Sequence, residues 1–172
     1  FKSMQRWVVS TDRDAATNAE FGASITYGGV AYTADTAAYR AAKFKAEFED
    51  YFVANAMDFH YLFTDENCMT DNRAKNLFMC YEYIEALDDY RWSVRCDYDN
   101  DTGLGNDNSG GLTFGYGLED TDKVGDTDVF NAADSVLWCN IRDLRKEELT
   151  LLHIKLAGSG AWNPDRRSKK FR

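Results

Sequence analysis

The sequence predicts an α+β domain in which helices pack around a central β-hairpin. Two observations lead to this fold class. Between residues 36 and 64, apolar side chains recur at helical spacing in two successive segments, which is typical of amphipathic helices. Between residues 76 and 98, two apolar and aromatic segments flank a short acidic connection, which is typical of paired strands. We expect residues 1–172 to form a single domain, because no linker divides the chain.

The start of the chain predicts a helix and a small hairpin. In the segment from Phe1 to Thr11, Met4, Trp7 and Val8 stand at helical spacing. Residues 26–33 alternate around a Gly-Gly pair, and this pattern predicts two short strands joined by a tight turn.

Two stronger helices follow. Asp35 or Thr36 can cap the first, and its apolar stripe consists of Ala41, Phe44, Phe48, Tyr51 and Phe52. The second is expected to run from Ala54 to about Thr64 and to pack against this stripe through Met57, Tyr61 and Leu62. His60 lies in this helix without a second ligand at helical spacing, so we expect a core or rim histidine.

The next elements surround the most polar part of the chain. Strands are predicted at residues 76–83 and 91–98, joined through residues 85–89. A short strand at residues 112–118 and an acidic loop at residues 119–128 should follow. Asn131 or Asp134 then opens a helix, and a further helical stretch over residues 147–156 should end at Gly158.

Composition narrows the possible functions. A formal charge of −9 disfavours a nucleic-acid partner, because a surface of that sign repels phosphates. No apolar run is long enough to span a membrane. The four cysteines are irregularly spaced, which disfavours structural zinc, and Cys80 and Cys96 are expected to be buried free thiols. Because the first residue is Phe1 and the last residues are basic, we expect the chain to be a fragment of a longer protein.

Two polar motifs stand at the two ends of the predicted hairpin. Asp71 and Asn76 precede its first strand with D-x-x-x-x-N spacing, and Asp99 and Asp101 follow its second strand. Because an antiparallel hairpin returns the chain to its starting point, both motifs can share one pocket. Phosphoryl transfer needs a carboxylate that accepts the hydroxyl proton, and amide and carboxylate oxygens that hold Mg²⁺. The pattern thus predicts Asp71 as the catalytic base and Asn76, Asp99 and Asp101 as metal ligands.

Other interpretations of these residues remain open at this stage. Asp71 and Asn72 could simply cap or turn the chain, with residues 97–101 forming a solvated loop. Asp97, Asp99 and Asp101 also match the first positions of an EF-hand calcium loop. The required glycine, however, is one residue late at Gly103, and Asn108 replaces the final Glu. A hydrolytic two-metal site is a third alternative.

The motif Asp71-x-Arg73-x-x-Asn76, followed by Asp99-x-Asp101-x-x-x-Gly105, resembles the CotH family of spore-coat kinases. The chain is more closely similar to CotH-like regions in large virion or tail proteins of small, short-tailed phages of gut bacteria. The segments that carry the resemblance are residues 42–48, 61–64, 71–76, 98–102 and 134–138.

The resemblance implies a protein-kinase-like fold, of which this chain would be the C-lobe portion. It implies a divalent metal at Asn76, Asp99 and Asp101 (Mg²⁺, or Mn²⁺ or Ca²⁺), and ATP binding through Asn76 and Asp99 if the site is active. Met69 and Thr70 stand where a conventional kinase has His and Arg, Asn100 stands where it has Phe, and neither a phosphate-covering glycine loop nor a strand lysine is identifiable.

The function that follows from the resemblance is that of a structural, tail-associated protein of the phage virion that carries a kinase-like domain. The alternative is an active Mg²⁺- and ATP-dependent protein kinase that acts on Ser or Thr of a coat or host-surface protein. The expected partners are other virion proteins or a host-surface protein within a larger assembly.

Overall fold

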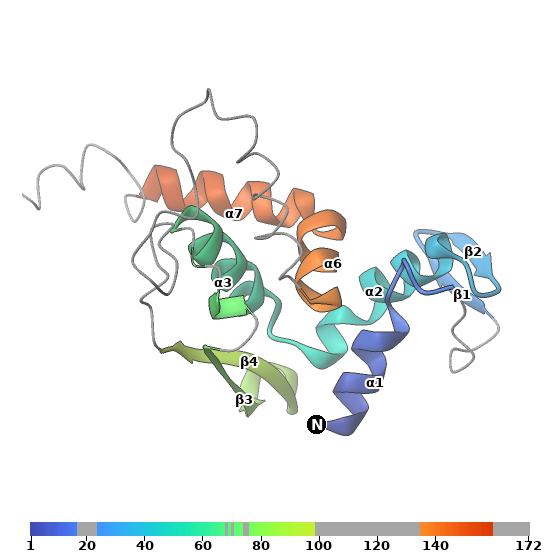
Figure 1. Ribbon diagram of the computed structural model, residues 1–172, viewed down its shortest axis with the longest axis horizontal. Helices are drawn as coiled ribbons and strands as arrows, with labels where there is room; N and C mark the ends of the chain where they lie inside the picture. The colour runs from blue at the N-terminus through green and yellow to red at the C-terminus, as the bar shows by residue number, and fades with distance from the viewer. Residues whose placement is uncertain (17–23, 68, 70, 74–75, 99–134, 160–172) are drawn as a thin grey trace, which may run out of the picture.

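The computed structural model describes residues 1–16, 24–67, 69, 71–73, 76–98 and 135–159 (Figure 1). The described residues form a mixed α+β structure with five α-helices and two separate two-stranded antiparallel sheets. The α+β prediction is therefore confirmed. The helices are α1 (Lys2–Ser10), α2 (Ala37–Tyr51), α3 (Ala54–Glu66), α6 (Val136–Leu144) and α7 (Lys146–Ser159).

The first sheet is the small hairpin that the Gly-Gly pair predicted. It consists of β1 (Ser24–Tyr27) and β2 (Val30–Thr33). Gly28 and Gly29 have φ angles of +57° and +78°, in the left-handed region that favours glycine. Thr36 then caps α2, because its Oγ1 accepts a hydrogen bond of 3.1 Å from Tyr39 N.

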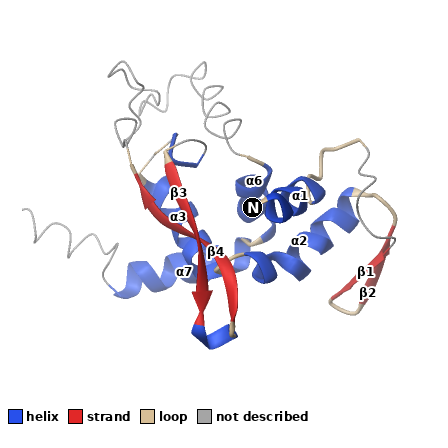
Figure 2. Cartoon of the chain, turned by 90° about the horizontal axis from the view of Figure 1, so that it is seen from below, coloured by secondary structure: helices blue, strands red, loops and turns tan. Residues whose placement is uncertain are grey.

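The second sheet is a longer hairpin, β3 (Leu77–Ile84) and β4 (Asp89–Asp97), joined by a 3₁₀ turn at Glu85–Leu87. It lies against one side of the helices rather than at their centre (Figures 1 and 2). Val53, between α2 and α3, donates a backbone hydrogen bond of 2.9 Å to Trp92 O and so attaches the hairpin to the helices. The register shifts at Phe78 and Met79, where the strand is irregular.

One hydrophobic core joins the helices to this hairpin. Phe44 and Phe48 of α2 are fully buried in the same cluster as Met57 and Tyr61 of α3, as the helical stripe predicted. Trp7 of α1 stacks on Phe44 at a ring-centroid distance of 5.5 Å. The remaining buried members of the cluster are Met4, Phe52, Leu137, Trp138, Ile141 and Leu149.

Several sequence expectations have a different outcome. Cys80, Cys96 and Cys139 are free thiols, but the expected burial is wrong, because Cys80 is half-buried and Cys96 is exposed. Ser135, not Asn131 or Asp134, is the N-cap residue of α6. The strand expected at residues 112–118 and the acidic loop at residues 119–128 lie outside the described residues. Within the described ranges, no helix is long and apolar enough to cross a membrane.

Candidate functional site

The open end of the β3–β4 hairpin brings together the regions that precede and follow its strands. Leu77 pairs with Asp97 in the last register position. Beyond it, the Tyr98 backbone N–H donates a hydrogen bond of 3.2 Å to the Asn76 carbonyl. Asn76 of the first motif therefore lies beside the residues that lead directly into Asp99, as the hairpin argument predicted.

Asn72 connects the first motif to both strands. Its side chain is fully buried, and its amide Nδ2 donates to the carbonyl oxygens of Asn76, at 3.2 Å, and Tyr98, at 3.3 Å. Since this one amide group contacts the chain before β3 and the chain after β4, it holds the 3₁₀ turn Asp71–Arg73 against the hairpin end.

Arg73 fixes the same turn from the other side. Its Nε donates to Thr64 Oγ1 at 2.8 Å, and its guanidinium lies 4.4 Å from the centre of the Tyr61 ring. Trp138 of α6 donates from its indole nitrogen to the Arg73 carbonyl at 2.6 Å. Arg73 is only 3% exposed, so these contacts are shielded from water.

The predicted site residues are described to different extents. Asp71 begins the 3₁₀ turn, and only its backbone belongs to the described part of the structure. Asn76 is buried, with 7% of its surface exposed. Asp99 and Asp101 lie outside the described residues, so the convergence of all four side chains stays a prediction.

A histidine and a carboxylate face each other at this end of the hairpin. His60 Nε2 lies 3.0 Å from the carbonyl oxygen of Asn72, and Nδ1 lies 3.5 Å from Asp97 Oδ1. A carbonyl only accepts hydrogen bonds, so Nε2 carries the proton of the neutral ring and Nδ1 presents its lone pair to Asp97. Asp97 Oδ1 is buried and receives no hydrogen bond within the described part of the chain.

Burial dominates the electrostatics of this pair. It lowers the pKa of His60 to about 4, helped by the nearby positive charge of Arg73 and opposed by the hydrogen bond to Asn72. It raises the pKa of the Asp97 carboxyl to about 6. The histidine is therefore neutral at pH 7. Its side chain is buried, which confirms the expected core role.

A cavity of about 250 Å³ opens beside the pair. Phe59 and Phe63 of α3 form one wall, with their rings stacked at 6.0 Å, and Val94 of β4 lies in another. His60 and Asp97 also line it. His60 was not predicted as a site residue, and Asp97 was considered only as the first position of the EF-hand alternative. The sequence signal that could have indicated Asp97 is its position at the end of a predicted strand, two residues before Asp99.

The hard oxygen ligands that a divalent metal prefers are present in this region as amide and carboxylate groups. Among the described residues, however, no three His, Cys, Asp or Glu side chains gather closely enough to hold a metal ion. The buried Asp97 oxygen shows that this end of the hairpin can hold a carboxylate away from water. A metal would require the further carboxylates of Asp99 and Asp101.

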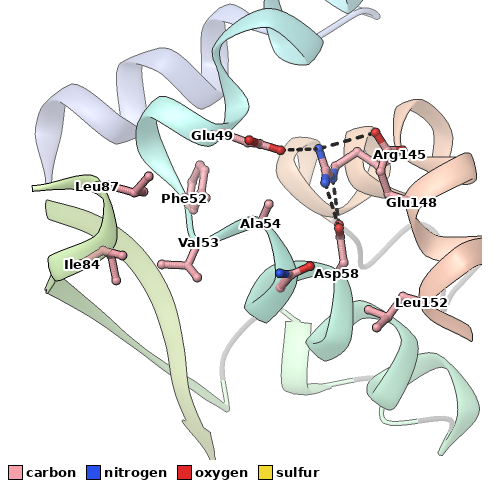
Figure 3. A pocket seen from close by; sticks show the side chains of 11 residues that line it. Glu49, Phe52, Val53, Ala54, Asp58, Ile84, Leu87, Arg145, Glu148 and Leu152 are labelled. Atoms are coloured by element: carbon pink, nitrogen blue, oxygen red, sulfur yellow. Dashed lines mark hydrogen bonds and ion pairs between the residues drawn. The ribbon is translucent and has the colours of Figure 1, made fainter. Parts of the chain in front are cut away.

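A second polar cluster lies in a separate cavity of about 370 Å³ (Figure 3). Arg145 donates from Nε and Nη2 to the two carboxylate oxygens of Asp58, at 2.8 and 2.9 Å. Both side chains are at least nine-tenths buried, and the guanidinium lies 4.6 Å from the centre of the Phe48 ring. The fork-to-fork pairing joins α3 to the junction of α6 and α7, so we assign this pair a structural role.

Comparisons of this chain with models of protein families, with curated proteins and with solved structures found no match.

Proposed function

We propose that this chain is a CotH-like, protein-kinase-like module of a phage virion protein and that the open end of its β3–β4 hairpin binds a divalent cation. The observation that carries the proposal is the contact of Asn72 with both Asn76 and Tyr98. It joins the Asp-x-x-x-x-Asn motif to the chain that enters the second acidic motif, which a shared catalytic or metal pocket requires.

The packing around Arg73 supports the same proposal. Three of the segments in which the sequence resembles CotH-like proteins contribute to one cluster, through Tyr61 and Thr64, through Arg73, and through Trp138. These segments are far apart in the chain, and together they hold the turn that carries Asp71.

In the proposed site, Asn76, Asp99 and Asp101 would hold the cation, and Asp71 would orient a hydroxyl group and accept its proton. A bound Mg²⁺ or Mn²⁺ would neutralise negative charge on the phosphates of ATP. The buried contacts of Asn72 and Arg73 hold the backbone of the Asp71–Arg73 turn in place.

Purified phage particles test the virion assignment. An antibody against this chain should detect the parent protein in particles that have been banded on a density gradient, at a constant ratio to the major capsid protein across the band. A replication protein of the same phage serves as the control and should be absent. If the parent protein remains with the soluble replication protein, it is not a virion component.

An active protein kinase is the second candidate function, and the restrained Asp71 turn favours it. With ATP and Mg²⁺, the full-length protein should transfer the γ-phosphate to Ser or Thr of a protein substrate. Asp71→Ala should abolish transfer, whereas Glu85→Ala, at the closed end of the hairpin, should retain it. Labelling that persists in Asp71→Ala would show that Asp71 is not the base, and absence of labelling with wild-type protein would favour a purely structural role.

A further inference from the structure

The closed end of the β3–β4 hairpin carries a row of partly exposed aromatic rings. Tyr83 pairs with Tyr90 and Tyr81 pairs with Trp92 across the two strands, so all four side chains lie on the same face. Successive ring centroids are 5.3 Å apart for Tyr83 and Tyr90, 5.3 Å for Tyr90 and Tyr81, and 5.1 Å for Tyr81 and Trp92. The three tyrosines are 49–56% exposed, well above what core packing would leave.

This face leaves the hydrophobic core as it approaches the closed end. Met79 and Val94, the next pair on the same face, pack against the core, as Trp92 does in part. The tyrosines continue this face towards the closed end, where about half of each side chain is exposed. Core formation therefore accounts for Trp92 but not for the exposed rings, and exposed aromatic clusters of this kind mark binding surfaces.

The rings form part of a pocket rather than a flat patch. Tyr81, Tyr90 and Trp92 line a cavity of about 230 Å³ together with residues from the start of α1 and the end of α2. These residues are the N-cap Phe1, Ser3 and Met4 of α1, and Asp50 and Tyr51 of α2. Asp89 and Arg91 of β4 complete the wall.

Polar groups in the wall are available to a ligand. Arg91 is held in place, because its Nε donates to the Glu49 carbonyl at 2.7 Å and its Nη1 donates to Asp89 Oδ2 at 2.5 Å. Its Nη2 makes no hydrogen bond to the described residues. The Asp50 carboxylate and the Tyr81 and Tyr90 hydroxyls likewise make no hydrogen bond to the described residues. The pocket therefore offers a ligand both hydrogen-bond donors and acceptors.

We propose that this pocket binds a neutral carbohydrate. The aromatic rings offer apolar surface to the C–H groups of a sugar ring, and rigid Tyr and Trp side chains lose little conformational entropy when they do so. The Asp50 carboxylate can accept hydrogen bonds from sugar hydroxyls, and the fixed guanidinium can donate to them.

Charge and size select this class of ligand. The wall contains both carboxylates and a guanidinium, so a ligand of either sign would meet a repelling group. The chain's net charge of −9 further disfavours acidic sugars. An apolar peptide would cover the Asp50 carboxylate without offering it a hydrogen bond, at a cost in free energy. A sugar ring meets both needs, because its apolar face can lie on the aromatic side chains while its hydroxyls bond to Asp50 and Arg91.

The test is a glycan array that contains neutral, amino and acidic oligosaccharides, probed with the labelled chain and followed by titration of the best ligand. Wild-type protein should bind neutral glycans. Tyr81→Ala and Asp50→Asn should each raise the dissociation constant by about tenfold or more. Phe78→Ala is the control, because Phe78 is equally exposed on the same strand but lies outside the pocket. Thermal melts should show that all variants fold.

Three outcomes would overturn the proposal: no binding to neutral glycans, binding to acidic glycans alone, or equal affinity of wild type and both pocket variants. The site is distinct from the proposed cation site at the other end of the hairpin. A variant with Asp99 replaced by Asn should therefore bind the glycan as wild type does, so the failure of one proposal leaves the other intact.

Discussion

The indole nitrogen of Trp138 donates a hydrogen bond of 2.6 Å to the backbone carbonyl of Arg73, across 65 residues of sequence. This contact ties α6 to the turn that begins with Asp71. Because both groups are buried, the carbonyl would have no access to water if the indole were removed.

Replacement of Trp138 by Phe tests this link. Trp138→Phe keeps an aromatic ring in the core but leaves the Arg73 carbonyl without its donor, so we expect a loss of about 1–3 kcal/mol in the free energy of unfolding. Urea denaturation measures it. A loss below about 0.5 kcal/mol, the scale of ordinary surface substitutions, would show that the hydrogen bond does not hold the turn.

Deletion of the Phe48 ring tests whether the stripe on α2 is core or interface. Phe48 is fully buried, so Phe48→Ala should cost on the order of 3–5 kcal/mol in chemical denaturation. Leu151→Ala is the matched control, because Leu151 is 68% exposed on α7 and should cost under about 0.5 kcal/mol. Similar small losses in both variants, combined with failed particle assembly, would mean that the stripe is a subunit interface.

Replacement of only one partner of the Asp58–Arg145 ion pair should lower the free energy of unfolding. Asp58→Ala leaves a buried guanidinium without its bidentate partner, and we expect a loss of about 3–5 kcal/mol in unfolding free energy. The double variant Asp58→Leu with Arg145→Met removes both charges and should recover most of that loss. If the double variant is as unstable as the single one, packing rather than charge pairing determines the role of these residues.

The buried ring of His60 should resist protonation. Its pKa is lowered to about 4 in the folded chain from an ordinary value of 6.5. Folding therefore favours the neutral ring. The resulting stability is fully present above pH 6.5 and is lost as the pH falls through about 4, a contribution on the order of 3 kcal/mol. The groups that face the ring are Asp97, the Asn72 carbonyl, Arg73 and Trp138.

NMR titration of the His60 ring carbons measures this pKa directly. His60 should remain neutral at pH 5.5. A midpoint near 6.5 would show that the ring is solvated, and a midpoint above 7 would show that it forms an ion pair with ionised Asp97.

Local sequence patterns predicted the helices, strands and turns of this fold better than they predicted the contacts between those elements. The Thr36 cap, the Gly28-Gly29 turn and the stripe of α2 all depend on neighbouring residues, so the sequence alone indicates them. The hairpin also predicted that Asn76 would lie beside the residues that lead into Asp99.

Long-range contacts could not be predicted in the same way. The pairs His60–Asp97, Asp58–Arg145 and Arg73–Trp138 connect elements whose relative placement no local period encodes. His60 has a core role, as expected, but its carboxylate partner emerged only from the three-dimensional structure. The shift of register at Phe78 and Met79, which moves side chains between the faces of the hairpin, likewise leaves no signal in the apolar alternation.

Thermal unfolding with and without Mg²⁺ or Mn²⁺ tests the proposed cation site at the open end of the β3–β4 hairpin most directly. Binding to the folded state raises its stability by about 2.7 kcal/mol at one hundred times the dissociation constant. We predict a clear rise in melting temperature for wild type and for the control Glu85→Gln at the closed end, and a much smaller rise for Asp99→Asn. Equal rises in all three proteins, or none in wild type, would contradict the account.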